Sequence, residues 1–83
     1  MILADQIRQC VLHNLITPAR VAGHKQVTVR AGDVHQAMGL ADRMPAVCGA
    51  LDAHKFLSYA SVQLISRTGP RQGANAEWFF GWN

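Results

Sequence analysis

Two cysteines and two histidines have types and spacings that could bind a metal. Cys10 and His13 are three residues apart, on one face of a helix, and Cys48 and His54 follow later in the chain. Four such side chains would suit tetrahedral zinc. Cys48 and His54, however, are six residues apart and fall on different sides of a helix, and both cysteines lie in apolar patterns. We therefore expect buried, reduced thiols and no metal or other cofactor.

No set of residues fits a catalytic site. The cysteines lack neighbours that would stabilise a thiolate, so a cysteine–histidine nucleophile is not expected. Gly69 and Gly73 lack the Lys-Ser or Lys-Thr pair of a phosphate-binding loop. The 5 acidic residues are scattered singly, which leaves no carboxylate pair for acid–base catalysis. The sequence predicts a protein that is not an enzyme.

Basic side chains are the remaining candidates for function. The chain carries 8 Lys and Arg against 5 Asp and Glu, which gives a net charge of +3 and a pI near 9.4. Most of these bases are arginine, which binds phosphates and base edges through paired donors. Arg67 and Arg71 lie in or beside a glycine-containing segment that also holds Gln72 and Asn75. This balance favours a polyanionic partner.

Length and composition limit the class of protein further. With 83 residues, 49% of them apolar, the chain is expected to form a single domain over 1–83. No apolar run is long enough to span a bilayer. The start MILADQIRQ carries an acid where a secretory signal needs bases. We therefore expect a cytoplasmic protein with no membrane partner.

Helical and strand periods alternate along the first half of the chain. Apolar residues recur every three to four positions over 2–15 and predict a helix. It should end near Thr17-Pro18, because a residue before proline is pushed out of helical geometry. The alternation in Gln26–Arg30 predicts a short strand. A second helix is expected over 31–38, and Gly39 should end it.

A third helix is predicted after a tight turn. Asp42 is expected to be its N-cap, and Pro45 fits its first turn, where a missing N–H is tolerated. Beyond Ala53 the chain is expected to fray, with Phe56 and Tyr59 folding back onto the core. An inward stripe recurs at helical spacing: Met44, Val47, Cys48 and Leu51. The opposite face carries mostly small residues: Arg43, Ala46, Gly49, Ala50 and Ala53.

The last third of the chain predicts an antiparallel hairpin. Strands are expected over Val62–Arg67 and Ala76–Trp82, joined by the loop Thr68–Asn75. On the second strand Trp78 and Trp82, with the phenylalanine midway between them, alternate on one face. Such a stripe is typical of core packing, with the residue nearest the terminus partly exposed.

This order of helix, short strand, helix, tight turn, helix, strand, basic loop and strand resembles the winged helix-turn-helix domain. The resemblance rests on the stretch Val29–Leu40, the turn to Asp42, the helix Met44–Leu51 and the loop Thr68–Asn75. The stretch Gly32–Leu51, with its GDVH, MGL, MPAVC and AL segments, also resembles a stretch found in small prokaryotic proteins. The resemblance implies an α+β fold with three helices, a short strand and a C-terminal β-hairpin wing.

The same resemblance implies a function. In such a domain the third helix enters the major groove of duplex DNA, and the wing lies along the flanking backbone. The resemblance implies a non-catalytic regulator of transcription or of a mobile element, which acts by occupying its site; a homodimer would add specificity. Arg43 is the candidate for a base contact. Phosphate contacts and wing donors are expected from six further residues: Arg30, Lys55, Arg67, Arg71, Gln72 and Asn75.

A second hypothesis uses the same scaffold without DNA. Alanine and glycine on the outer face of the third helix also suit the close docking of a partner helix. The domain would then be a protein–protein interaction module of a larger complex. The two hypotheses differ in charge distribution. DNA binding requires four arginines to share one face: Arg30, Arg43, Arg67 and Arg71.

Overall fold

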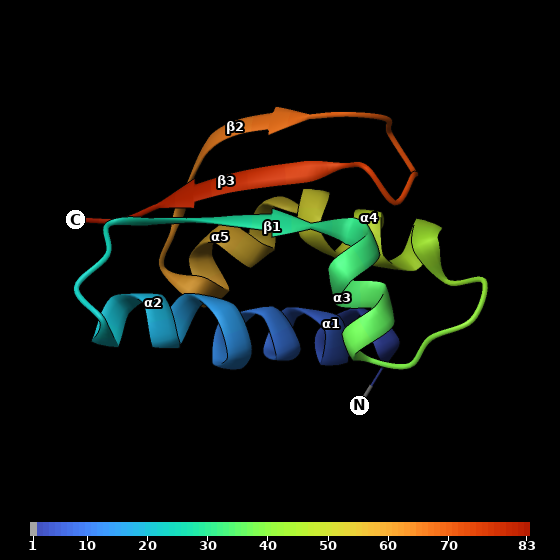
Figure 1. Cartoon of the computed structure of the whole chain (residues 1–83), viewed down its shortest axis with the longest axis horizontal. Helices are drawn as coiled ribbons and strands as arrows, with labels where there is room; N and C mark the ends of the chain where they lie inside the picture. Colours follow the sequence, from blue (N-terminus) through green and yellow to red (C-terminus); the bar gives the residue numbers. More distant parts are fainter. Residues whose placement is uncertain (1) are drawn as a thin grey trace.

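The computed structural model describes residues 2–83 and shows an α+β fold (Figure 1). Its sheet has three antiparallel strands, β1 (Gln26–Arg30), β2 (Gln63–Thr68) and β3 (Glu77–Gly81), in the order β1-β3-β2. The sheet lies along one side of the molecule and the N-terminal helical segment along the other. The predicted strands and the hairpin pairing are confirmed, with ends displaced by at most one residue. Met1, part of the predicted domain, is outside the described residues.

The first helical segment continues past Thr17-Pro18, so the predicted end was wrong. The α-helix α1 (Leu3–Val11), the π-helical turn η1 (Leu12–Ile16) and the α-helix α2 (Thr17–Val21) follow one another directly. Proline has no N–H and clashes with the preceding turn of a regular helix. The wider π-helical turn before Pro18 accommodates it, and Pro18 lies in the first turn of α2.

The two helices in the middle of the chain form as predicted, but the cap between them differs. They are α3 (Ala31–Ala37) and α4 (Met44–Asp52). Gly39, with a φ of 65°, follows α3 in the left-handed region that glycine favours. Asp42 also has a positive φ, 55°, and stays in the connecting turn, so the N-cap of α4 is Arg43.

A further helix, α5 (His54–Ala60), takes the place of the frayed segment that was expected. Ala53 is extended and separates α5 from α4. Phe56 and Ala60 are four residues apart on one face of α5 and are buried. Their burial stabilises a short helix that local propensity did not predict. Tyr59, expected on the core, is 49% exposed.

The core lies between the sheet and the helices. Trp78 and Phe80 of β3 are fully buried, and Trp82 is half-buried, as the alternation predicted. Phe56 meets Phe80 at a ring-centroid distance of 5.2 Å in an edge-to-face arrangement. Other large side chains that are fully buried come mainly from the helices: Ile7, Val11, Ile16, Val29 and Val47. Among residues 2–83, no helix is both long and apolar enough to cross a membrane.

Candidate nucleic-acid interface

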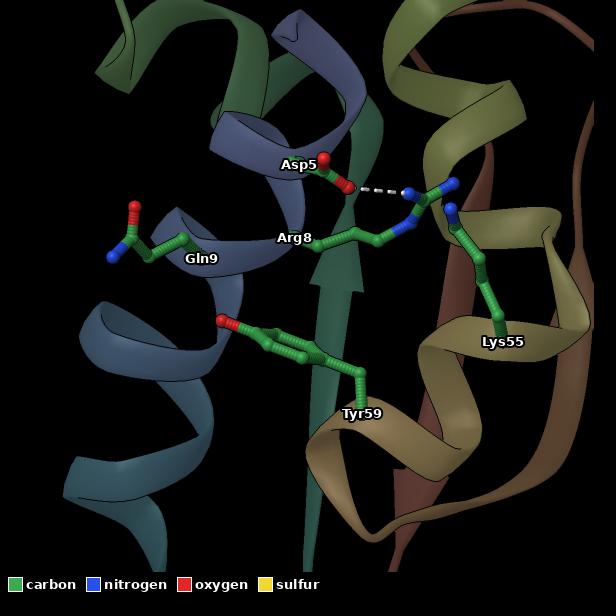
Figure 2. Close-up of a pocket in the computed structure, with 5 residues that line it drawn as sticks. All are labelled: Asp5, Arg8, Gln9, Lys55 and Tyr59. Carbon is green, nitrogen blue, oxygen red and sulfur yellow. Dashed lines mark hydrogen bonds and ion pairs between the residues drawn. The ribbon is translucent and has the colours of Figure 1, made fainter. Parts of the chain in front are cut away.

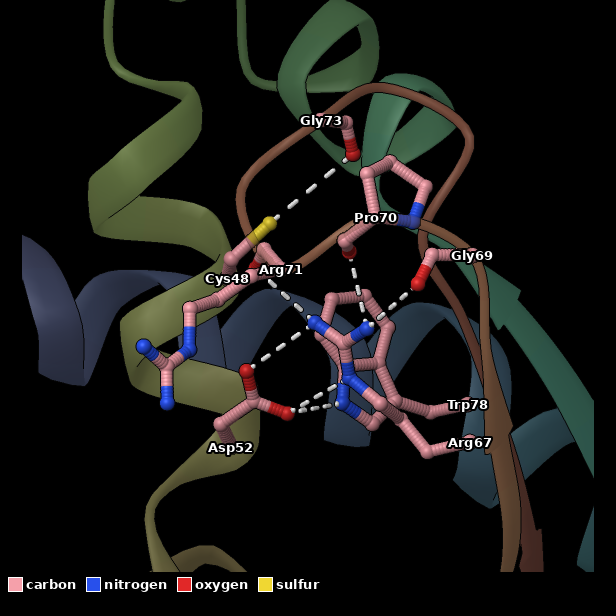
Figure 3. A network of polar contacts seen from close by, with 8 residues as sticks. All are labelled: Cys48, Asp52, Arg67, Gly69, Pro70, Arg71, Gly73 and Trp78. Carbon is pink, nitrogen blue, oxygen red and sulfur yellow. Dashed lines mark hydrogen bonds and ion pairs between the residues drawn. The ribbon is translucent and has the colours of Figure 1, made fainter.

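The loop that joins β2 to β3, residues 69–76, is termed the wing loop. Arg67, at its base, donates to both carboxylate oxygens of Asp52 in α4, at 3.0 and 3.1 Å (Figure 3). It also donates to the carbonyl oxygens of Gly69, Pro70 and Arg71, at 3.2, 2.8 and 2.9 Å. These five bonds use all five N–H donors of a guanidinium. Arg67, predicted to contact phosphate, is therefore committed to holding the wing loop in place.

Asp52 joins the wing loop, α4 and the sheet. Besides Arg67 it accepts a 2.7 Å hydrogen bond from the indole N–H of the buried Trp78. The Arg67 guanidinium lies over the Trp78 ring, 5.0 Å from its centroid. The hydrogen bonds to Asp52 raise the pKa of Arg67 above its ordinary value. Sequence reasoning did not identify this network, since only the folded chain brings together residues 15 and 26 positions apart.

The far end of the wing loop is attached to the start of α3. The backbone N–H groups of Ala31 and Gly32 donate to the carbonyls of Ala76 and Ala74, both at 2.9 Å. The Arg30 side chain donates to the Asn75 amide oxygen at 2.8 Å and to Asp33 at 3.1 Å. Arg30 and Asn75, both predicted to bind DNA, are thus brought together. The Arg30 side chain is 38% exposed, and within residues 2–83 the amide NH₂ of Asn75 donates no hydrogen bond.

Cys48 lies beneath the wing loop. Its thiol approaches the Gly73 carbonyl at 3.9 Å and it is buried as predicted, whereas Cys10 is only half-buried. Burial raises the pKa of the Cys48 thiol above its ordinary value, because the thiolate would lose its hydration. No three His, Cys, Asp or Glu side chains among residues 2–83 gather where they could hold a metal ion.

A pH prediction follows from the buried thiol. Below the ordinary thiol pKa of 9.0 both states of Cys48 are protonated, and stability is unaffected. Above it the unfolded chain loses its proton first, so the free energy of unfolding should fall, by at most about 1.4 kcal/mol per pH unit. Urea unfolding from neutral to alkaline pH should show a shallower fall in Cys48→Ala. Cys10→Ala is the control, and an equal effect of both substitutions would contradict the prediction.

Two arginines beside α4 remain free. Arg43 and Arg71 are exposed, and in residues 2–83 only their backbone atoms form hydrogen bonds. Figure 3 shows the Arg71 side chain extending from the wing loop toward α4. The exposed Gly49 has no atom within 4 Å of where a Cβ would stand, so this part of α4 is open. Ala50, predicted on this open face, is instead buried.

The other bases are paired or lie elsewhere. Arg8 is buried and donates to the Ala50 carbonyl at 3.1 Å, which explains why that face of α4 is covered. Arg20 donates to the Ala60 and Ser61 carbonyls at the end of α5. Lys55, predicted to contact phosphate, lines a pocket between α1 and α5 (Figure 2). The positive surface beside the wing loop is therefore smaller than the sequence suggested.

In the described residues, α3 and α4 are consecutive helices joined by a short connection, and the wing loop is hydrogen-bonded to the start of α3 and, through Arg67, to α4. In comparisons with known proteins, no family model, no curated protein and no solved structure matches this chain.

Proposed function

We propose that this chain is a winged helix-turn-helix domain that binds duplex DNA without catalysis. The observation that carries the proposal is the double attachment of the wing loop, to Asp52 of α4 and to the start of α3. A loop held at both sides presents its donors next to α4 without paying to order them on binding. The helix α5, inserted between α4 and the hairpin, is an addition to the three helices that the resemblance implies.

The proposed contact surface combines two free charges with several neutral donors. Arg43, at the N-terminus of α4, would reach a base edge, and Arg71 a phosphate. Gln72 and the Asn75 amide supply uncharged donors from the wing loop. Gly49 has no side chain, so the DNA backbone can approach α4 closely there. Asp52 does not oppose binding strongly, because Arg67 neutralises its charge.

The electrostatic contribution to DNA binding should be modest. With Arg67 committed and Lys55 in a separate pocket, the proposed ionic contacts are Arg30, Arg43 and Arg71. About three cationic contacts that release counterions predict a log–log salt slope near −3, where six would give roughly −5. Such a domain would regulate by occupying a site, with no chemistry of its own, and a second copy would add specificity.

Neutralising the free arginines tests the proposal. We expect Arg43→Gln and Arg71→Gln each to weaken binding to a labelled duplex of random sequence by about 5- to 10-fold at low salt. Each should also reduce the salt slope by about 1. Fluorescence anisotropy titrations at two or more salt concentrations measure both quantities. The matched control is Lys25→Gln, which removes the same charge from the residue before β1.

The control is informative because of its position. Lys25 precedes Gln26, which pairs with Gly81 at the end of β3. The wing loop lies at the opposite end of β3, before Glu77. Equal loss in Lys25→Gln and Arg71→Gln would mean diffuse attraction and would contradict a defined interface. Absence of binding even at low salt would reject the DNA proposal.

One observation favours the second hypothesis, a protein partner. On the outer face of α4, Pro45 and Gly49 are exposed, Ala46 is half-buried, and none of the three carries a charge, which suits the docking of a partner helix. A homodimer through the hairpin edge is less favoured, because β2 has an irregularity between Leu64 and Ser66, and such bulges oppose edge-to-edge pairing. If anisotropy shows no DNA binding, this α4 face is the place to seek a partner.

A further inference from the structure

A pocket lies between α1 and α5 (Figure 2). Its volume of about 440 Å³ falls in the range of sites that hold small organic molecules. None of its lining residues belongs to the wing loop: Asp5, Arg8, Gln9, Lys55 and Tyr59. Any ligand here would be separate from the proposed DNA interface.

Arg8 forms the floor of this pocket and is already fixed in place. Its side chain is 8% exposed; Nε donates to the Ala50 carbonyl and Nη1 to Asp5, both at 3.1 Å. Nη2 has no partner among residues 2–83. Since no buried side-chain nitrogen or oxygen in that range lacks a partner, Nη2 must reach solvent. Arg8 lines this pocket, so Nη2 reaches solvent there and its two N–H donors face the pocket.

Lys55 adds a second cation to the same pocket. Its ammonium makes no hydrogen bond or ion pair with the described part of the chain, and in Figure 2 it points toward the Arg8 guanidinium. Asp5 is the only carboxylate in the lining and is paired with Arg8. The pocket therefore holds one uncompensated positive charge, and two like charges facing each other favour an anion between them.

An aromatic ring forms one wall. Figure 2 shows the Tyr59 ring crossing the space between α5 and α1, with its hydroxyl on the α1 side. The ring of the buried Phe56 lies 6.4 Å from it, centroid to centroid, and supports it from the core. The exposed face of Tyr59 is a flat apolar surface in the same pocket as the two cations. A planar ligand would stack on such a surface.

We propose that this pocket binds a small aromatic carboxylate. Nε and one N–H of Nη1 are already bonded, so Nη2 is the Arg8 nitrogen with both N–H groups unpaired in residues 2–83, and Lys55 offers Nζ. These two donors match the two oxygens of one carboxylate, one oxygen to each residue. The aromatic ring of the ligand lies against Tyr59. The inference does not depend on DNA binding, because no lining residue of the pocket belongs to the proposed DNA interface. Lys55, which the sequence analysis assigned to that interface, lies in the pocket instead.

Benzoate and benzamide form a matched pair of probes, because they have nearly the same shape and only benzoate is charged. We expect benzoate to shift the amide signals of Gln9, Lys55 and Tyr59 and the Nε–H signal of Arg8 in ¹⁵N–¹H correlation spectra. The shifts should saturate with a dissociation constant on the order of a few millimolar, as expected for so small a ligand. Benzamide should bind at least about 5-fold more weakly.

Lys55→Gln removes one positive charge from the exposed side of the pocket without disturbing the core, and it leaves an uncharged amide donor. It should weaken benzoate binding about 3- to 10-fold, whereas Lys25→Gln should leave it unchanged. Equal binding of benzamide and benzoate, no effect of Lys55→Gln, or benzoate shifts confined to Arg43 and Arg71 would each overturn the proposal. The fold of each variant is checked in the same spectra from the dispersion of its signals.

Discussion

Replacing Asp52 by alanine is expected to lower the free energy of unfolding by about 2–4 kcal/mol. The substitution leaves the buried indole N–H of Trp78 without a partner and removes the carboxylate that binds Arg67. An unpaired buried donor costs about 1–3 kcal/mol, and the ion pair adds to this. The side chains of Arg67 and Asp52 are 20% and 38% exposed, so solvent screens part of the loss. In a chain of 83 residues this corresponds to a fall in Tm of about 10–20 °C.

Two further variants separate the parts of this effect. Asp52→Asn keeps an oxygen that can accept from Trp78 but removes the charge that pairs with Arg67. It should fall between the wild type and Asp52→Ala. Asp33→Ala, which breaks an exposed ion pair with Arg30, should cost less than about 1 kcal/mol. Urea unfolding followed by tryptophan fluorescence measures all three. Equal stability of Asp33→Ala and Asp52→Ala would show that the network does not hold the fold.

Substituting Gly69 by alanine is expected to displace the wing loop. Gly69 has a φ of 87°, which disfavours alanine, and the new Cβ would collide with the Asn75 carbonyl oxygen and lie 3.0 Å from the Cα of Ala76. Both neighbours are backbone and cannot rotate away, so the loop itself must move. We expect a loss of about 3 kcal/mol in the free energy of unfolding. DNA affinity should also fall at least about 10-fold, because Arg71 and Asn75 move with the loop.

Gly23 provides a matched control for this substitution. It has the same φ, 87°, but no atom lies within 4 Å of the position that a Cβ would take. Gly23→Ala therefore carries only the conformational cost, about 1 kcal/mol, and should leave DNA binding unchanged. The difference between the two variants isolates the packing of the wing loop. If Gly69→Ala loses stability but binds DNA as tightly as Gly23→Ala, the wing loop is not part of the interface.

Local patterns in the sequence were enough for much of the fold. The alternation in Gln26–Arg30 and the hairpin pattern gave the correct strands, and helical spacing gave the buried stripe of α4. These signals come from neighbours within a few residues. Pro18 misled the prediction of the first helix, because its cost depends on the turn before it, and a π-helical turn there accommodates the ring.

The candidate site was predicted only in part, since the sequence lists charges but not their partners. From its eight basic residues, the sequence predicted a broad positive surface. In the folded chain Arg8 and Arg20 donate to carbonyls about 40 residues away, and Arg67 uses every donor on Asp52 and the wing loop. Arg43 and Arg71 remain as free cations beside α4. No spacing rule could tell these arginines apart.

By itself, the sequence determined the three strands and the helices α1, α3 and α4 in their order, the apolar stripes that form the core and the excess of positive charge. These depend on residue type and short-range periodicity, which the chain carries before it folds. Only the tertiary structure decided which arginines face solvent, that Asp52 holds the wing loop, and that Lys55 joins Arg8 in a pocket of its own. Such pairings depend on distances between segments far apart in the chain, and these distances exist only after folding.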